Sequence, residues 1–178
     1  MRISLIGLPG SGKSTVGRSL AGVLDTPFFD CDFEVEQQLG CSIRNHFEVC
    51  GEESFRDLEA SVLLGLMLQP TAIISTGGGV VGRLENRLVL RGSSFVIYLH
   101  SMPDEIFKRL RHDRSRPLLQ VADPMESLRN MYEVRDPLYR EVAHFTIETG
   151  RPSASSLVST IVMQLQLLKL ISATYGSD

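Results

Sequence analysis

Residues 7–14 carry the clearest chemical signal in the chain. They read G-L-P-G-S-G-K-S and match the phosphate-binding pattern G-x-x-x-x-G-K-[ST]. Glycines let the backbone curl so that its N–H groups point inward and can hold phosphate oxygens. Lys13 adds a positive charge for the outer phosphates, and the Ser14 hydroxyl can ligate Mg²⁺. Because the apolar run Ile3–Ile6 precedes the loop and an amphipathic stretch follows it, the segment predicts a site for a nucleoside triphosphate.

The phosphate loop alone does not distinguish a molecular switch, a motor or a metabolic kinase. The sequence has no N-K-x-D or T-K-x-D motif to read guanine and no D-x-x-G switch. The strand predicted at 72–76 ends in three glycines, 77–79, rather than in the aspartate that usually supports the metal. A carboxylate must then come from elsewhere, and Asp30-Cys31-Asp32 is the obvious source.

Asp30 and Asp32 lie one residue apart after a short predicted strand. If the strand continues through them, their side chains point to opposite faces. One carboxylate could then face the metal while the other faces an acceptor hydroxyl. Asp32 could instead cap the helical stretch that starts at Phe33, and the sequence does not choose between these roles.

Other residues could hold an acceptor by its far end. Gly77-Gly78-Gly79 would let a ligand approach the backbone because no Cβ is in the way, although a plain tight turn has the same composition. Arg56 lies in a helical segment and Arg135 in Val134–Tyr139. The planar fork of arginine donates two parallel hydrogen bonds and so matches a carboxylate best. Either arginine alone is more often a surface charge, so their meaning comes from the combination.

Five short runs rich in β-branched or aromatic residues could form the sheet that positions these groups. They are Ile3–Leu8, Pro27–Asp30, Ala72–Thr76, Phe95–His100 and His144–Thr149. Helical periodicity between them predicts an α/β fold with a parallel sheet covered by helices on both faces.

The apolar faces expected on the helices follow from the same periodicity. They are Val16, Leu20, Val23 and Leu24; Ala60, Leu63, Leu64 and Met67; and Leu157, Ile161, Val162, Leu165 and Leu168. The last of these helices is expected to begin at a serine cap, Ser153, Ser155 or Ser156.

The composition predicts one domain over 1–178, because 178 residues suffice for an ordinary core. A net charge of −3 gives no electrostatic case for nucleic acid or an anionic membrane as partner, and no apolar run approaches the length of a bilayer span. The cysteines suit a reducing cytosol, where we expect them to pack as small hydrophobes: Cys31, Cys41 and Cys50. No signal peptide is expected, and four histidines receive no role: His46, His100, His112 and His144.

The segment 109–123 differs from the rest because it is basic and carries few core residues. Its arginines are Arg109, Arg111, Arg114 and Arg116. Such a segment could be a solvated surface or a lid that closes over the site.

Over roughly residues 1–152 the chain resembles shikimate kinase, of the nucleoside-monophosphate-kinase-like P-loop fold. The matching pieces stand in the family's order: 7–15, Asp30-x-Asp32, Phe55-Arg56, Thr76–Gly79, Arg116-Pro117-Leu118-Leu119 and Arg135-x-Pro137-Leu138-Tyr139. The resemblance implies a three-layer α-β-α fold around a five-stranded parallel sheet, with a lid near 109–123. It implies transfer of the ATP γ-phosphoryl group to the 3-hydroxyl of shikimate, with Mg²⁺, in a cytoplasmic monomer of the aromatic amino acid pathway.

For the nucleotide side, the resemblance implies that Lys13 contacts the transferring phosphates, Ser14 ligates Mg²⁺, and Asp30 supports the metal through water. Arg116 would touch the phosphates when the lid closes. The other expected ATP-binding residues are Gly10, Ser11, Gly12, Thr15, Arg109 and Arg151, the last two beside adenine.

For the acceptor side, the resemblance implies that Asp32 binds shikimate hydroxyls and orients or deprotonates the attacking one. Arg56 and Arg135 would grip the carboxylate, and Gly78-Gly79 would border the ring. Two other functions stay open: another small-molecule kinase of this fold, such as a gluconate or nucleoside-monophosphate kinase, and a regulatory domain that binds nucleotide without catalysis.

Overall fold

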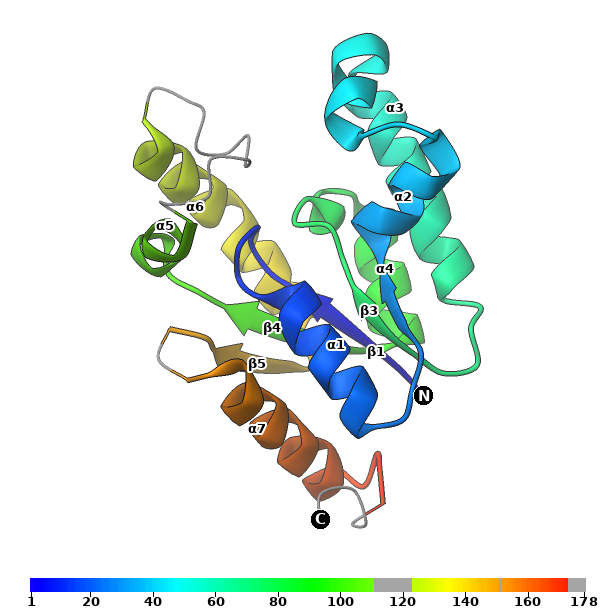
Figure 1. The fold of residues 1–178 in the computed structure, drawn as a ribbon, viewed down its shortest axis with the longest axis vertical. Coiled ribbons are helices and arrows are strands. Elements are labelled where there is room, and N and C mark those ends of the chain that lie inside the picture. The colour runs from blue at the N-terminus through cyan, green and yellow to red at the C-terminus, as the bar shows by residue number, and fades with distance from the viewer. Residues whose placement is uncertain (111–122, 151, 173–178) are drawn as a thin grey trace.

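The computed structural model describes residues 1–110, 123–150 and 152–172 (Figure 1). Its centre is a five-stranded parallel sheet in the order β2-β3-β1-β4-β5. The strands are β1 (Arg2–Ile6), β2 (Phe28–Asp30), β3 (Ala72–Ser75), β4 (Phe95–His100) and β5 (Phe145–Glu148). Each predicted strand overlaps an observed one, so the predicted five-stranded parallel sheet is confirmed.

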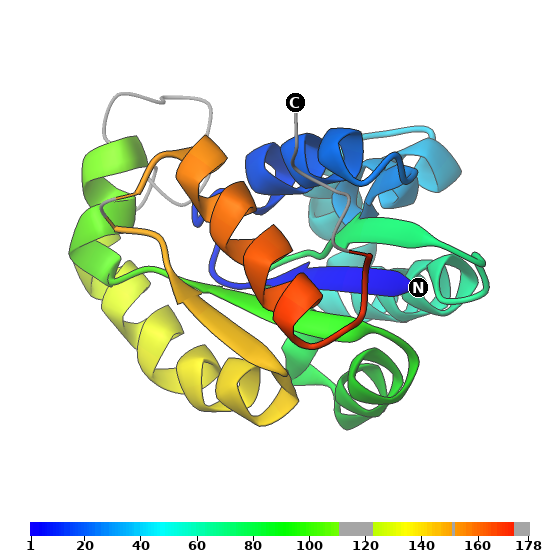
Figure 2. The same cartoon turned by 90° about the horizontal axis from the view of Figure 1, so that it is seen from below.

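Helices cover both faces of this sheet, as Figure 2 shows when the sheet is seen edge-on. They are α1 (Lys13–Val23), α2 (Cys31–Leu39), α3 (Ile43–Leu66), α4 (Leu84–Ser93), α5 (Pro103–Leu110), α6 (Pro124–Val142) and α7 (Ala154–Leu167), with a 3₁₀ turn η1 (Val80–Gly82). Helices α1 and α7 cover one face, and α3, α4 and α6 lie on the other. None of the helices in the described ranges is long and apolar enough to traverse a membrane.

Alternating side chains of the strands divide between two cores. Ile3 and Leu5 of β1 pack with α1 and α7, whereas Val96 and Tyr98 of β4 pack with the helices of the opposite face. Because both faces are covered, the central strands read as nearly continuous apolar runs.

Three residues predicted to face the core are exposed instead. Val23 is the last residue of α1, and Leu168 caps the end of α7, so neither lies under a neighbouring element. Leu64 points away from the buried stripe of α3, which includes Val62, Leu63 and Leu66.

The predictions for helix starts and cysteines fared unevenly. Ser153 caps α7 by accepting the Ser156 N–H, which confirms the predicted serine cap. Cys31 is buried as expected, but Cys50, which precedes the helix interruption at Gly51 (φ 82°), is exposed.

Candidate active site

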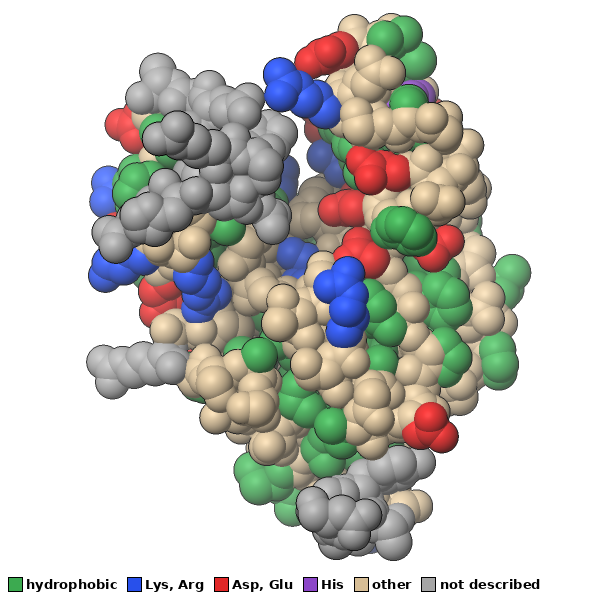
Figure 3. Space-filling model, viewed as in Figure 1, with side chains coloured by type: hydrophobic (Ala, Val, Ile, Leu, Met, Phe, Trp, Pro, Cys, Tyr) green, Lys and Arg blue, Asp and Glu red, His purple; other side chains and the backbone are tan. Residues whose placement is uncertain are grey.

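A cleft opens at the carboxyl ends of the central strands, between the α5–α6 side and the α2–α3 side of the molecule (Figure 3). The loop after β1 lies at its base, where the chain leaves a strand flanked by β3 and β4 and enters α1. This is the place at which open α/β sheets bind ligands. A cavity of about 350 Å³ here is lined by Pro9, Gly10, Gly12, Lys13, Ser14, Thr15, Asp30, Asp32, Ser75, Thr76, Gly78, Arg109 and Leu110.

The loop between β1 and α1 has the backbone of an anion cradle. Gly10 and Gly12 adopt φ values of 83° and 96°, in the left-handed region that glycine enters without strain. Gly12 is also the N-cap of α1, so the free N–H groups of the first turn point at the cavity. The Lys13 ammonium lies across the loop and donates to the carbonyls of Gly7 and Leu8, each at 2.9 Å. These groups together can hold phosphate oxygens.

Ser14 and Asp30 meet at one edge of the cradle. The Ser14 hydroxyl donates to Asp30 Oδ2 at 2.6 Å and lies 3.3 Å from the Ser75 hydroxyl. A hydroxyl beside a carboxylate is the oxygen donor set that Mg²⁺ prefers.

The condition for placing the two aspartates on opposite faces, a strand that continues through both, is not met. Helix α2 begins at Cys31, directly after Asp30, so the strand does not continue and both Asp30 and Asp32 line the same cavity. The residue that caps α2 is Asp30, whose Oδ1 accepts the Asp32 N–H at 3.2 Å. Asp32 therefore does not have the capping role that the sequence left open for it.

Two carboxylates converge on Gly77. A Cβ built on this glycine would lie 2.5 Å from Glu59 Oε1 and 2.8 Å from Asp32 Oδ1. Asp32 reaches solvent at the mouth of the cleft, but the protein around it removes much of its hydration and raises its pKa, which Lys13 opposes. Burial likewise raises the pKa of Glu59, and Arg56 opposes that shift.

Arg56 is fixed by acids of its own helix. Its Nη1 donates to Glu59 Oε2 at 2.7 Å, and its Nη2 to Glu52 Oε1 at 3.0 Å. The guanidinium lies against Gly79, where a Cβ would come within 2.6 Å of Arg56 Cζ. Gly79 thus lets the cation approach the backbone of the glycine turn.

Arg135 reaches the same turn from α6. Its Nη1 donates to the Gly78 carbonyl at 3.0 Å, and the Tyr139 hydroxyl donates to the same oxygen. Burial raises the pKa of the Tyr139 phenol well above its usual value, so that group stays a hydrogen-bond donor. The structure therefore brings two guanidinium groups to adjacent glycines beside the cavity that Asp32 lines.

A second cavity, of about 230 Å³, lies on the other side of the phosphate loop. Ser11, Arg109, Thr149, Gly150 and Pro152 are among its lining residues. Arg109 is held there by the Thr149 carbonyl, which accepts from Nη2, and by the Ser101 hydroxyl at 3.4 Å. Two of the predicted site residues, Arg116 and Arg151, and most of the predicted lid, 111–122, lie outside the described residues.

The sequence reasoning missed Glu59 and gave Tyr139 no role. Glu59 is 1 % exposed, and its Oε1 has no hydrogen-bond partner within the described parts of the chain. It occupies a position of the apolar stripe of α3, between Phe55 and Leu63. A charged residue in such a stripe was the available signal, because an acid is rarely buried without a function or a partner.

Comparisons with known proteins agree with this geometry. The sequence model described as shikimate kinase matches residues 9–166. The shikimate kinase of Paracidovorax citrulli is 52% identical over 170 residues, covering 94% of this chain and 93% of that protein. The shikimate kinase of Burkholderia thailandensis is 46% identical over 171 residues, covering 96% of this chain and 93% of that protein.

Solved structures give the same result. A shikimate kinase from Acinetobacter baumannii in complex with shikimate superposes with a TM-score of 0.90 at 41% identity, covering 96% of this chain and 95% of that one. A gluconokinase from Sinorhizobium meliloti shares the fold, with a TM-score of 0.64 at 18% identity. The match of the family model over most of the chain, together with relatives near half identity, shows that the chain belongs to the shikimate kinase family.

Proposed function

We propose that this protein transfers the γ-phosphoryl group of ATP to the 3-hydroxyl of shikimate. One observation carries the assignment of the acceptor: the guanidinium groups of Arg56 and Arg135 both meet the Gly78-Gly79 backbone, next to a cavity that also contains the phosphate loop and Asp32. Two cations at one end and a carboxylate nearer the phosphates suit a small acceptor with a carboxylate and hydroxyls.

The phosphate loop is assigned to the ATP phosphates. Lys13 and the N–H groups at the start of α1 would neutralise the phosphate charge, which is the main requirement of phosphoryl transfer. The cavity beside Arg109 and Pro152 is assigned to adenine, because it adjoins the loop and offers a guanidinium plane and a flat apolar ring. Arg151 and the lid residue Arg116 stay predicted contacts of adenine and phosphate.

One Mg²⁺ ion is assigned to Ser14, with Asp30 acting through water. Their oxygen atoms fit such an ion, and no group of three or more possible metal-ligating side chains occurs among the described residues. A site of this kind suits Mg²⁺, which usually keeps several waters and shares its remaining ligands with the substrate phosphates. Bound there, the ion would supply positive charge to the phosphates.

On the acceptor side, Arg56 and Arg135 would hold the shikimate carboxylate while Gly78 and Gly79 border its ring. Fixing the far end of the acceptor aligns one hydroxyl with the γ-phosphate, so remote binding energy is used for orientation. Asp32 would accept a hydrogen bond from that hydroxyl and take its proton as the new bond forms. Glu59 would hold Arg56 in place rather than touch the acceptor.

The test of this proposal is ADP release by the purified protein with MgATP. Shikimate is the acceptor, and gluconate, AMP and CMP are controls. Turnover confined to shikimate is expected. Turnover with another acceptor would keep the nucleotide site but refute the acceptor assignment, and ATP binding without turnover would favour a regulatory domain.

The setting of the reaction is also a proposal. We propose a cytoplasmic monomer that needs neither nucleic acid nor a membrane. Its net charge of −3 gives no electrostatic case for nucleic acid or an anionic membrane as partner.

A further inference from the structure

Helix α6 carries Arg135 but is weakened close to it. Pro137 lies inside the helix, two residues after Arg135. Proline has no backbone N–H, so the hydrogen bond that would reach the carbonyl of Glu133 is missing. The backbone of α6 therefore does not by itself fix the direction in which Arg135 leaves the helix.

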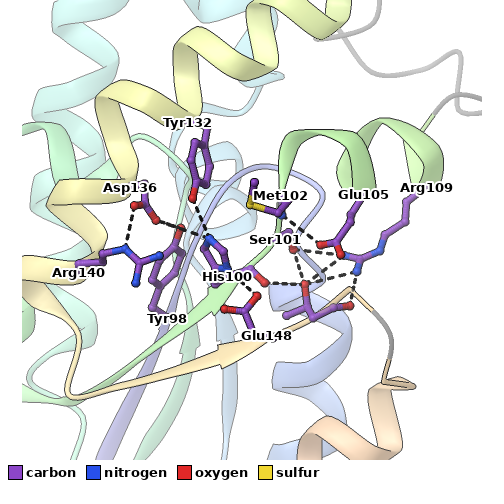
Figure 4. Close-up of polar contacts among 11 residues, drawn as sticks. Tyr98, His100, Ser101, Met102, Glu105, Arg109, Tyr132, Asp136, Arg140 and Glu148 are labelled. Carbon is purple, nitrogen blue, oxygen red and sulfur yellow. Dashed lines mark hydrogen bonds and ion pairs between the residues drawn. The ribbon is translucent and has the colours of Figure 1, made fainter.

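The carboxyl end of β4 supplies contacts that the helix lacks. Tyr132, Asp136 and Arg140 occur at intervals of four residues and so form one face of α6, which points at Tyr98 and His100 (Figure 4). The Tyr98 hydroxyl donates to Asp136 Oδ1 at 2.9 Å, and Arg140 Nε donates to Asp136 Oδ2 at 2.8 Å.

His100 is the centre of this cluster, because both of its ring nitrogens are engaged. Nδ1 lies 2.6 Å from Glu148 Oε2, and Nε2 lies 3.0 Å from the Tyr132 hydroxyl and 3.8 Å from Asp136 Oδ1. Its side chain is 7% exposed. The imidazole thus joins β4 and β5 to the N-terminal side of Pro137, while Tyr98 packs on Tyr139 on the C-terminal side, with ring centroids 4.9 Å apart.

His100 does not line either cavity of the candidate active site. It can influence the acceptor only through α6, where Arg135 and Tyr139 both donate to the Gly78 carbonyl. A shift of about 1 Å in a group that orients a substrate can reduce the rate on the order of 100-fold. A buried imidazole with two partners can therefore affect acceptor binding indirectly, through the position of α6.

We propose that His100 is a positioning residue: its bonds to Glu148 and Tyr132 hold the part of α6 that precedes Pro137 and carries Arg135, so that Arg135 meets the acceptor carboxylate. The proposal rests on the proposed function for the identity of the acceptor. It assigns a role to His100, whose spacing in the sequence indicated none.

The first test compares His100→Phe with His144→Phe. His144 is a matched control because it joins the same two strands at their other end, where its Nδ1 accepts the Val96 N–H at 3.0 Å. His100→Phe is expected to raise KM for shikimate about tenfold and to leave KM for ATP unchanged. His144→Phe is expected to change neither. An equal rise of both constants in His100→Phe would refute the positioning role.

Tyr132→Phe is a second variant that should disturb folding less than His100→Phe, since it removes only the hydroxyl that contacts His100. We expect the same selective rise in KM for shikimate, of about threefold, as the loss of one hydrogen bond predicts. An unchanged KM for shikimate in this variant would contradict the proposal.

A double-mutant cycle then asks whether His100 acts through Arg135. In an Arg135→Lys background, His100→Phe should change KM for shikimate by less than about twofold, because the side chain that it positions is already altered. If the two effects multiply instead, His100 does not work through Arg135.

A measurement without substrate separates this proposal from the proposed function. Hydrogen–deuterium exchange of the α6 amides should be faster in His100→Phe than in His144→Phe, and equal rates would refute the positioning role of His100. If the wild-type protein releases no ADP with shikimate, the proposed function fails, but the exchange result still decides whether His100 holds the helix.

Discussion

The two halves of the candidate active site are built in different ways. The nucleotide half comes mainly from one continuous stretch, 7–15, and depends on backbone N–H groups and on glycines with positive φ. The acceptor half gathers side chains from α2, α3 and α6 around the turn at 77–79. A backbone cradle is thus a local property of the chain, whereas a cluster of opposite charges exists only once distant elements have packed.

The sharpest test of this division replaces the two aspartates of 30–32 in turn. Asp32→Asn should lower kcat by about 10²–10⁴-fold, the usual contribution of a positioned proton acceptor, with little change in ATP binding. Asp30→Asn should instead raise KM for MgATP, because Asp30 contacts Ser14. Steady-state kinetics measure both effects, and unchanged turnover in Asp32→Asn would remove Asp32 from the mechanism.

Arg135→Lys tests whether acceptor binding needs the two parallel hydrogen-bond donors of a guanidinium group or only a positive charge. Lysine keeps the charge but cannot donate two parallel hydrogen bonds, so KM for shikimate should rise about 10–100-fold, as expected for loss of charged hydrogen bonds. Arg129→Lys is the control on the same helix, because Arg129 is exposed and lies 3.9 Å from Asp104. Equal loss of affinity for ATP and shikimate would contradict the assignment of Arg135.

Two glycine substitutions should affect the two halves of the site separately, one through ATP binding and the other through shikimate binding. Alanine at Gly12 meets no atom within 4 Å but must adopt a φ of 96°, at a cost of about 1–2 kcal/mol, so ATP binding should weaken about tenfold. Alanine at Gly79 has an ordinary φ but collides with Arg56, so the shikimate KM should rise instead. Gly22→Ala, which meets nothing within 4 Å in α1, should leave both constants unchanged. If both substitutions affected the same substrate, the division of the site into a nucleotide half and an acceptor half would be refuted.

The pH dependence of kcat/KM gives the smallest expected effect. Asp32 must be ionised to accept a proton. Because its pKa is raised in the ligand-free protein, the ionised form is lost at a pH above the usual aspartate pKa of about 3.9. Activity should therefore fall by a few fold as the pH is lowered through that raised pKa. Glu59 also has a raised pKa, so Glu59→Gln is the control and should keep the acid limb. A limb that disappears in Glu59→Gln would reassign it to Glu59.

The sequence predicted the fold and the strand–loop–helix geometry of the phosphate loop well, because both depend on local patterns. Buried strands bounded by turns, and glycines at fixed offsets, keep their meaning whatever the rest of the chain does. Opposite faces for Asp30 and Asp32 required the strand to continue through both residues, and this condition is not met because Asp30 caps a helix that begins one residue later. A competing local rule, helix capping, determined the geometry.

The acceptor half was predictable only in part. Arg56 and Arg135 could be predicted as site residues only from their combination with other motifs. Nothing in the sequence between them indicates that both guanidinium groups lie at neighbouring glycines. Glu59 was missed although its place in the apolar stripe of α3, three residues after Arg56, was a local signal. His100 was missed because its partners, Glu148 and Tyr132, lie on other elements, so no short spacing identifies them. Long-range packing, which a single sequence does not display, decides such positions.

The position of β1 in the sheet also has a consequence for biosynthesis. The phosphate-binding motif is complete once the ribosome has added Ser14, but β1 borders Ala72–Ser75 on one side and Phe95–Tyr98 on the other. A nascent chain that ends before Ala72 thus contains the whole motif and none of the strands that flank it. Because a ligand stabilises only the folded state that binds it, ATP can assist folding only after the fourth strand has left the ribosome.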